Sequence, residues 1–370
     1  MNNFDFYVRT KLKFGAGEAL NLAEYMRQAG FKKTALLIDQ AVLKSDYGQE
    51  IIKKTDFFKV SEYNLGSEPD YDSLEKWRTE FIQDGGPLVD SFVAIGGGSV
   101  IDFAKGLATL TTNLGPAISY RGFPDNLNPS LPLIAVPTTA GTGSEVTYNA
   151  AFIDQGQKKK LGINTTNNFP VLAVLDPNLT LTCPETVSIS SGLDALVHVF
   201  EGYGSVKSGR LTKIFAKEGF KLVFENLPKI IENPADLHAR GNLQLGAYLG
   251  GLTLLGSGGG PTGALSYTLG VNFKVPHGLA GGVFLPYIAS HNLKMGYDYA
   301  EFECGGNLSE KLFELYQYLK APLDLKCFHV SQSNAEPILK DIESFGGAFS
   351  QNPVPFTVED AKKLVLKLIK

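Results

Sequence analysis

Cysteine is scarce in this sequence, whose 370 residues include only three: Cys183, Cys304 and Cys327. An odd number of widely spaced cysteines gives neither a disulfide framework nor a zinc-binding pattern, which favours a reducing compartment. The N-terminus lacks the basic and apolar regions of a signal peptide. No apolar run approaches the roughly 20 residues that a membrane span requires. We therefore expect a cytoplasmic protein without a membrane partner.

An excess of positive charge is missing as well. Lysine and arginine number 34 against 38 aspartates and glutamates, which gives a formal net charge of −4. Because a nucleic-acid-binding protein usually presents a basic face, we expect no nucleic-acid partner. Hydrophobic residues make up 44% of the chain, so material for a core is ample. A chain of this length exceeds the size at which one core stops growing, and two domains are expected.

The two halves of the chain differ in their hydrophobic patterns. Four apolar runs in the first half predict buried strands, at 34–39, 91–95, 133–136 and 171–175. Helical stretches separate these runs, which is typical of a parallel α/β sheet. Segments with helical periodicity dominate from about residue 181. We predict an α/β domain over 1–180 and an all-α domain over 181–370, packed so that a cleft for ligands lies between them.

Two polar loops follow predicted strands in the first half. Gly96-Gly97-Gly98-Ser99 leads into a helix, so its backbone can approach a phosphate near free helical N–H groups. It is not the GxGxxG fingerprint, and a glycine turn without a ligand explains it equally well. The loop 138–144 has four hydroxyls and two glycines, which suits a nucleotide. Asp39 ends an early strand and could bind a ribose hydroxyl or cap a helix.

The second half carries a candidate pair of metal ligands. Asp194 and His198 are four residues apart in a helix-forming run, so both project from one face about a turn apart. A carboxylate and an imidazole in this arrangement can hold a divalent cation, much as the histidines of HExxH do. From the spacing alone, an ordinary exposed pair is the more frequent explanation.

Five blocks give the chain a resemblance to the iron-containing alcohol dehydrogenase family that covers nearly its whole length. They are GGGSVIDFAK (96–105), PTTAGTGSEVT (137–147), LDP (175–177), SGLDALVHVFEGY (191–203) and VPHGLAGGVFLP (275–286). The resemblance implies a nucleotide-binding α/β domain with a parallel sheet, followed by a helical domain, the architecture shared with dehydroquinate synthase. It also implies NAD(P)-dependent hydride transfer at a metal in the cleft, and a homodimer.

The resemblance further implies roles for individual residues. On the pyrophosphate and nicotinamide side of the cofactor it places Gly97, Gly98, Ser99 and Asp102. Around the rest of the cofactor it places Thr138, Thr139, Thr142, Thr147 and Lys160. Asp39 stands where members that prefer NAD(H) to NADP(H) carry an acid, and Asn149 matches a residue near the substrate. The ligands of an Fe(II) or Zn(II) ion would include Asp194, His198 and His277.

One expected metal ligand is missing. The family segment before the Pro-His-Gly block carries two histidines, and here Gly263 takes the ligand position and Tyr267 the other. Asp194, His198 and His277 still form a two-histidine, one-carboxylate set that suits Fe(II) or Zn(II), with weaker binding expected. If no metal is held, Tyr267 and His277 become the candidate acid–base pair.

We therefore predict an NAD(P)-dependent alcohol dehydrogenase or aldehyde reductase acting on a small primary or secondary alcohol, or the corresponding aldehyde. Hydride would pass between the carbinol carbon and nicotinamide C4, with the proton handled by Tyr267 or by a metal-held water. One alternative is a sugar- or phosphonate-pathway oxidoreductase of the same fold with little or no need for metal. Another is a catalytically inactive nucleotide-binding homologue.

Overall fold

The computed structural model describes residues 4–65 and 68–370, which divide into two compact units. We call Val8–Thr139 with Ser144–Cys183 the α/β unit. The helical unit comprises Ala140–Gly143, Pro184–Lys370 and an N-terminal stretch that ends at Tyr7. The domains predicted from the sequence, 1–180 and 181–370, assign both short segments to the first domain instead.

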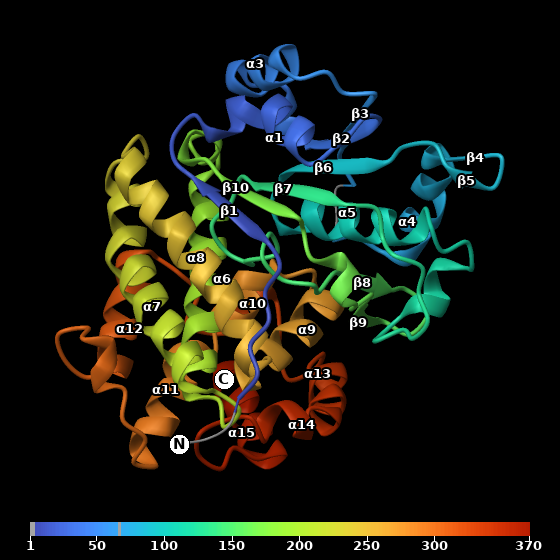
Figure 1. Ribbon diagram of the computed structural model, residues 1–370. Coiled ribbons are helices and arrows are strands. Elements are labelled where there is room, and N and C mark those ends of the chain that lie inside the picture. The colour runs from blue at the N-terminus through green and yellow to red at the C-terminus, as the bar shows by residue number, and fades with distance from the viewer. Residues whose placement is uncertain (1–3, 66–67) are drawn as a thin grey trace. The chain divides into compact units, whose positions relative to one another are not determined.

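Within the described residues, the α/β unit is built on a six-stranded sheet in which every pairing is parallel (Figure 1). Its strand order is β1 (Lys11–Phe14), β10 (Leu172–Leu175), β7 (Leu133–Pro137), β6 (Ser91–Gly96), β2 (Thr34–Asp39) and β3 (Lys59–Tyr63). The four central strands are those predicted from the apolar runs. The two edge strands were not predicted, because β1 is exposed along its whole length and β3 is only partly buried.

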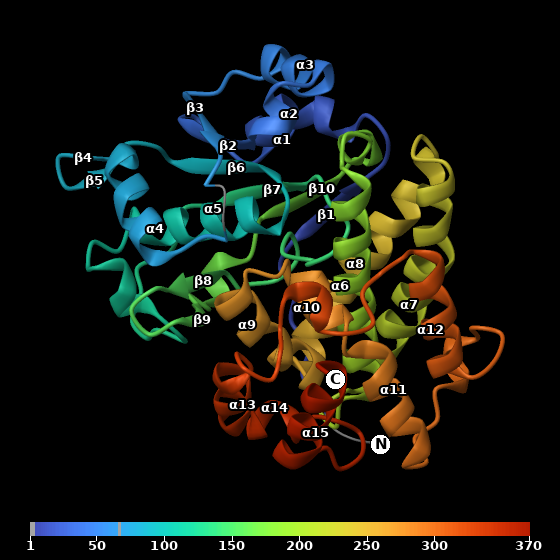
Figure 2. The ribbon, with the colours of Figure 1, turned by 180° about the vertical axis from the view of Figure 1, so that it is seen from behind.

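Helices cover both faces of this sheet. The α-helices of the unit are α1 (Leu22–Gln28), α2 (Gln40–Leu43), α3 (Asp46–Lys54), α4 (Tyr71–Arg78) and α5 (Gly98–Leu110). The unit also contains two small hairpins that are not part of the six-stranded sheet. One pairs β4 (Ile82–Gln83) with β5 (Gly86–Pro87), and the other pairs β8 (Ala151–Asp154) with β9 (Lys159–Gly162). Figure 1 and Figure 2 show α4 and α5 on one face and α1 and α3 on the other.

Alternate side chains of the central strands supply two separate cores. Leu37 and Ala94 pack in the core shared with α4 and α5. Their neighbours Ile38 and Ile95 pack in the core shared with α1 and α3. Because successive strand residues point to opposite faces, both faces must be apolar, which explains the uninterrupted hydrophobic runs in the sequence.

The helical unit packs around one hydrophobic core. Its α-helices are α6 (Glu185–Gly204), α7 (Arg210–Glu232), α8 (Leu237–Ser257), α9 (Pro261–Phe273), α10 (His277–Gly282), α11 (Leu285–Lys294), α12 (Leu308–Tyr318), α13 (Glu336–Asp341), α14 (Gly346–Phe349) and α15 (Val358–Leu368). Most residues of α6 are buried, because it contacts α7, α8, α9 and α10. In the part of the chain that the structure describes, no helix is long and apolar enough to cross a membrane.

Candidate active site

Three of the predicted cofactor-binding segments follow neighbouring strands of the α/β unit. β2, β6 and β7 are adjacent and parallel, and Asp39, Gly97 and Thr138 lie at or directly after their carboxyl ends. A Cβ added to Gly97 would lie 3.4 Å from the Thr139 side chain, so the loops after β6 and β7 are close together. Ligands of open parallel sheets bind beyond this edge. The fold thus gathers these residues where a nucleotide is expected.

The loop after β6 allows a close approach to its backbone. A Cβ on Gly96 would lie 2.3 Å from the Val100 side chain, so a larger residue would overlap the first turn of α5. The N-cap of α5 is Gly97, and no side chain caps this helix. An uncapped helix N-terminus offers N–H groups and the positive end of the helix dipole to an anion. Gly98 and Ser99 begin α5 and can present these groups to a phosphate.

Asp39 has a local structural contact. Its Oδ1 accepts a hydrogen bond from the Ala41 N–H at 2.8 Å and so caps α2. This is the helix-capping role that the sequence offered as an alternative to ribose binding. The side chain lies at the end of β2 and is only partly buried, so the carboxylate that caps α2 is still accessible to a ligand.

Asp102 belongs to a network of buried polar groups. Its Oδ1 accepts a hydrogen bond from the Ser144 hydroxyl, and its Oδ2 accepts one from the Ala151 N–H at 2.9 Å. Lys105 follows one turn later on α5 and is fully buried. The Lys105 Nζ donates to Ser144 Oγ at 2.8 Å and to the Asn149 carbonyl at 2.7 Å, and lies 3.7 Å from Asp102 Oδ1. The network joins α5 to the segment that carries the predicted substrate residue.

Burial controls the acid–base properties of this network. It lowers the pKa of Lys105 to about 8, although attraction from Asp102 and Glu145 acts in the opposite direction. Burial also raises the pKa of Glu145 to about 7, against the attraction of Lys105. Neither residue was predicted from the sequence. A lysine among the mostly apolar residues of α5 was the available signal.

The remaining predicted cofactor and substrate residues are divided between the two units. Thr147 is buried, and the Asn149 side chain is exposed. Lys160 of β9 forms an ion pair with Glu68, with 2.9 Å between Nζ and Oε1. Thr142 belongs to the helical unit, whereas Thr147, Asn149 and Lys160 belong to the α/β unit.

The three predicted metal ligands come together inside the helical unit. Asp194 and His198 share one face of α6, and the His198 Nε2 lies 3.6 Å from Asp194 Oδ1. His277 begins α10, and its Nε2 lies 3.8 Å from the same oxygen. Gly278 permits this approach, because a Cβ there would lie 1.8 Å from the Ser190 carbonyl oxygen of α6. One donor atom from each of the three side chains lies within 4.8 Å of the others.

These donor atoms fit a divalent transition metal. A cation about 2.1 Å from two ligand atoms at a tetrahedral angle would hold them roughly 3.4 Å apart. The two imidazole-to-carboxylate distances exceed this value by only a few tenths of an ångström. Two imidazole nitrogens and one carboxylate oxygen are ligands that Fe(II) and Zn(II) both accept. The exposed fractions of the Asp194, His198 and His277 side chains are 7%, 12% and 26%, so the cluster is shielded without being closed.

Gly263, where the family resemblance led us to expect a histidine, lies in the first turn of α9. Nearby on α6, the buried Glu201 carboxylate accepts hydrogen bonds from the N–H groups of Gly260 at 2.8 Å, Gly263 at 3.2 Å and Thr262. Burial raises the pKa of Glu201, and these backbone donors oppose the rise. A Cβ on Gly263 would lie 3.3 Å from Glu201 Oε2. Glu201, a residue that was not predicted from the sequence, therefore anchors the start of α9.

Tyr267 lies against His277 in this unit. The two rings stack with centroids 5.7 Å apart and planes inclined by 16°. Tyr267 is 40% exposed, so its hydroxyl-bearing ring is not simply a buried packing group. The structure therefore brings the predicted acid–base pair into direct contact.

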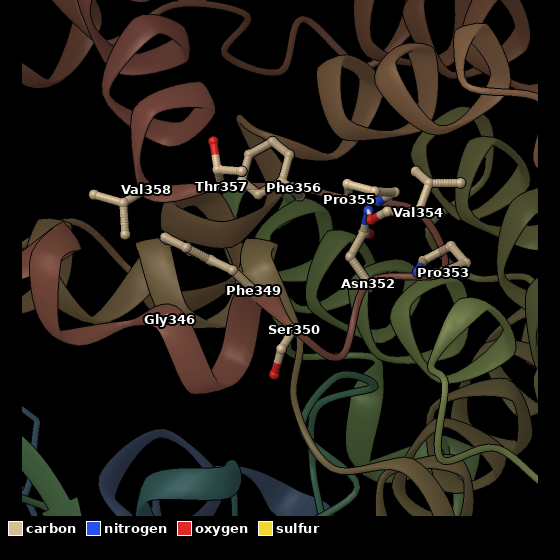
Figure 3. A pocket seen from close by; sticks show the side chains of 10 residues that line it. All are labelled: Gly346, Phe349, Ser350, Asn352, Pro353, Val354, Pro355, Phe356, Thr357 and Val358. Carbon is tan, nitrogen blue, oxygen red and sulfur yellow. Dashed lines mark hydrogen bonds between the residues drawn. The ribbon is translucent and has the colours of Figure 1, made fainter.

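A separate pocket lies at the C-terminal end of the helical unit. It has a volume of about 360 Å³ and is lined by residues between Gly346 and Val358, from α14 to the start of α15 (Figure 3). The labelled side chains include Ser350, Asn352 and Thr357, but no ionisable group is among the lining residues. The residues that line this pocket therefore offer no ionisable acid or base.

Known proteins match both units. The family pattern described as iron-containing alcohol dehydrogenase matches residues 9–177, and the C-terminal pattern of the Fe-containing alcohol dehydrogenase family matches residues 188–348. Alcohol dehydrogenase 4 of Schizosaccharomyces pombe is 31% identical over 293 residues, covering 78% of this chain and 68% of that protein. The NAD-dependent methanol dehydrogenase of Bacillus methanolicus is 28% identical over 296 residues, covering 78% and 76%.

The fold agrees with a solved structure of similar size. The sulfoacetaldehyde reductase from Bifidobacterium kashiwanohense superimposes with a TM-score of 0.88 over the whole of both chains, at 24% sequence identity. The predicted fold class, a parallel α/β domain followed by an all-α domain, is thereby confirmed. Together with the two family patterns, these matches show that the chain belongs to the iron-containing alcohol dehydrogenase family and is an oxidoreductase acting on CH–OH groups.

Proposed function

We propose that this protein is an NAD(H)-dependent alcohol dehydrogenase, or aldehyde reductase, that uses a divalent metal held by Asp194, His198 and His277. The observation that carries the proposal is the convergence of these three donor groups within 4.8 Å in a chain of this family. When bound, Fe(II) or Zn(II) would polarise the substrate oxygen and stabilise negative charge on it. The relatives give no better support to a sugar- or phosphonate-pathway enzyme or to an inactive homologue.

The α/β unit supplies the cofactor half of the reaction. The first turn of α5, with Gly97, Gly98 and Ser99, holds the pyrophosphate through backbone N–H groups. Thr138 and Thr139 lie beside this loop, and Asp39 stands at the end of β2 to bind the ribose. Asp102 accepts hydrogen bonds from the Ser144 hydroxyl and the Ala151 N–H, and so fixes the segment that carries the predicted substrate residue Asn149. Thr142, Thr147 and Lys160 complete the proposed cofactor set.

With three protein ligands, coordination positions remain for substrate. Gly263 contributes no ligand atom, so a substrate that carries a second oxygen beside its reacting carbon could supply one. We propose small alcohols or aldehydes of this kind as the substrates. A cytoplasmic homodimer, which the family resemblance and the cysteine content favour, completes the proposal; sedimentation equilibrium of the purified protein tests the dimer.

Tyr267 is our candidate for handling the substrate proton, and Tyr267→Phe tests it. Because the ring stacks on His277 and is 40% exposed, phenylalanine should keep the packing and remove only the hydroxyl. General acid–base catalysis contributes typically about 10²–10⁴-fold, so kcat should fall by about 100-fold while KM and metal content change little. Steady-state kinetics with the metal content determined in parallel provide the measurement. A variant with wild-type kcat would leave the proton to a water molecule and exclude Tyr267.

Cofactor choice is expected to depend on Asp39, and Asp39→Ser separates its charge from its capping role. Serine can still accept the Ala41 N–H, so α2 keeps its cap, but the carboxylate that would repel a 2′-phosphate is gone. The ratio of kcat/KM for NADH to that for NADPH should fall by about 10- to 100-fold. Asp39→Ala, the control, should show the same change in ratio and lose about 1 kcal/mol of stability in addition. An unchanged ratio in both variants would refute the assignment.

The function is tested by adding metal to purified protein from which metal has been stripped. Protein loaded anaerobically with Fe(II), or with Zn(II), should oxidise NADH in the presence of at least one member of a panel of small aldehydes. A chelator should abolish this activity, and readdition of the metal should restore it. Absence of NADH and NADPH oxidation with either metal, in protein shown to be folded, would contradict the proposed function.

A further inference from the structure

The two ring nitrogens of His277 face different partners. Its Nε2 points to the carboxylate of Asp194, with 3.8 Å between Nε2 and Oδ1. Its Nδ1 lies 3.1 Å from the Ser266 Oγ of α9. A neutral imidazole carries one proton, on one nitrogen or the other, and only the nitrogen without it can bind a metal. The partner of Nδ1 therefore decides whether Nε2 is free to be a ligand.

The Ser266 hydroxyl proton is used in a hydrogen bond within α9. Ser266 Oγ donates to the Gly263 carbonyl oxygen, three residues earlier on α9, at 2.6 Å. A serine hydroxyl has a single proton, so toward His277 its oxygen can only accept. The proton in the Ser266–His277 bond must then sit on Nδ1. This leaves the lone pair of Nε2 directed toward Asp194 and His198.

The position of Ser266 is itself well fixed. Its side chain is buried. The first turn of α9, which contains the Gly263 carbonyl that accepts its hydrogen bond, is held by Glu201 through the N–H groups of Gly260, Thr262 and Gly263. Tyr267, the next residue on α9, stacks on the face of the His277 ring. The hydrogen bond with Ser266 thus fixes the rotation of the imidazole within its ring plane, and stacking on Tyr267 fixes the tilt of that plane.

His198 provides a contrast within the same site. Its Nδ1 is buried and has no hydrogen-bond partner in the described part of the chain. Its ring is placed by α6, on which Asp194 lies one turn earlier. Of the two histidines, it is therefore His277, on α10, whose tautomer is selected by a hydrogen bond to Nδ1.

We propose that Ser266 is a positioning residue that holds His277 in the Nδ1–H tautomer and so prepares its Nε2 to bind the divalent cation. The inference rests on the proposed function, because it gives the His277 Nε2 the role of metal ligand. Partners of this kind fix the tautomer and orientation of ligating histidines, and their loss typically costs about 10- to 100-fold in metal affinity. In a site with three protein ligands, that loss should be easily measured.

The test combines zinc affinity with the tautomer of His277 in metal-free protein. Zinc affinity is measured by competition with a chromophoric chelator. In ¹⁵N-histidine-labelled protein, ¹⁵N–¹H correlation spectra report which ring nitrogen is protonated, and the His277→Gln spectrum identifies the signals. Wild-type protein should show protonated Nδ1. Ser266→Ala should bind zinc about 10- to 100-fold more weakly and lose this single tautomer.

Two further variants separate positioning from packing. Ser266→Thr keeps the hydroxyl and should restore the Nδ1–H tautomer and most of the affinity for zinc. Ser257→Ala removes another buried hydroxyl bonded to a helix carbonyl, that of Thr253 at 2.9 Å, and should leave both readouts unchanged.

The outcomes distinguish this inference from the proposed function. Protonated Nε2 in the wild type, or a Ser266→Ala variant with the wild-type tautomer and affinity, would overturn the role of Ser266. If the wild type binds no zinc but shows protonated Nδ1 that depends on Ser266, the metal-dependent function fails and the tautomer assignment stands.

Discussion

Asp194→Asn is expected to release the metal and to lower kcat/KM by about three orders of magnitude. Asp194 supplies the only carboxylate of the cluster, and its Oδ1 lies 3.6 Å from the Nε2 of His198 and 3.8 Å from that of His277. Asparagine keeps the shape of this buried side chain but replaces a charged ligand atom by a neutral amide. A bound metal stabilises the transition state by several kcal/mol. Because each 1.36 kcal/mol changes the rate tenfold, losing about 4 kcal/mol of this stabilisation lowers kcat/KM by about three orders of magnitude.

Metal analysis and kinetics of the same preparation measure this effect. The control is Asp236→Asn in the helical unit, because Asp236 caps α8 and asparagine is an equally good cap. The control should keep its metal and its activity. If Asp194→Asn retained stoichiometric metal and wild-type kcat/KM, the assignment of the three ligands would be wrong.

Lys105→Met is expected to have the largest effect on stability. The Nζ is fully buried and donates to Ser144 Oγ and to the Asn149 carbonyl, so methionine fills the space but removes these two hydrogen bonds and the cation beside Asp102. Removing one partner of a buried ion pair typically costs about 3–5 kcal/mol. Urea unfolding followed by circular dichroism should show this loss. KM for NADH should also rise, because the network carries Asp102 and supports Asn149.

The pH dependence of this loss identifies its electrostatic origin. Lys105 holds down the pKa of Glu145, which burial raises to about 7, so the variant should have a still higher Glu145 pKa. A carboxyl whose folded pKa is raised binds more protons in the folded than in the unfolded state, and stability falls as pH rises through that interval. In the wild type the interval runs from the unfolded value near 4.5 to about 7, and in the variant it extends higher.

The destabilisation by Lys105→Met should therefore be larger at pH 8 than at pH 5. At pH 5 Glu145 is protonated in both folded proteins and needs no cation beside it. Lys362→Met serves as the control, because Lys362 makes an ion pair with Glu343 at the surface, where solvent screens the charges and the contribution to stability is small. A loss of stability that did not depend on pH would assign the effect of Lys105 to packing alone.

The hydrophobic pattern of the sequence was enough to predict the central strands and the helical second half, and residue spacing was enough to predict one candidate ligand pair. Strands β2, β6, β7 and β10 are buried on both faces, so their apolar runs are continuous and can be read locally. The i,i+4 spacing of Asp194 and His198 fixes their common face once the helix forms. The edge strand β1 gave no such pattern, because all four of its residues are exposed.

The contacts between polar groups far apart in the chain could be identified only from the folded structure. Lys105 and Ser144 are 39 residues apart, and Glu201 and Gly260 are 59 apart, so neither contact leaves a periodic trace in the sequence. Ser266 of α9 and His277 at the start of α10 are 11 residues apart, and only the packing of the two helices brings hydroxyl and imidazole together. Hydrophobic periodicity depends on neighbours along the chain, whereas a hydrogen bond depends on where the folded chain returns. The absence of a histidine at Gly263 was visible in the sequence, but its neighbours Glu201 and Ser266 were revealed by the fold.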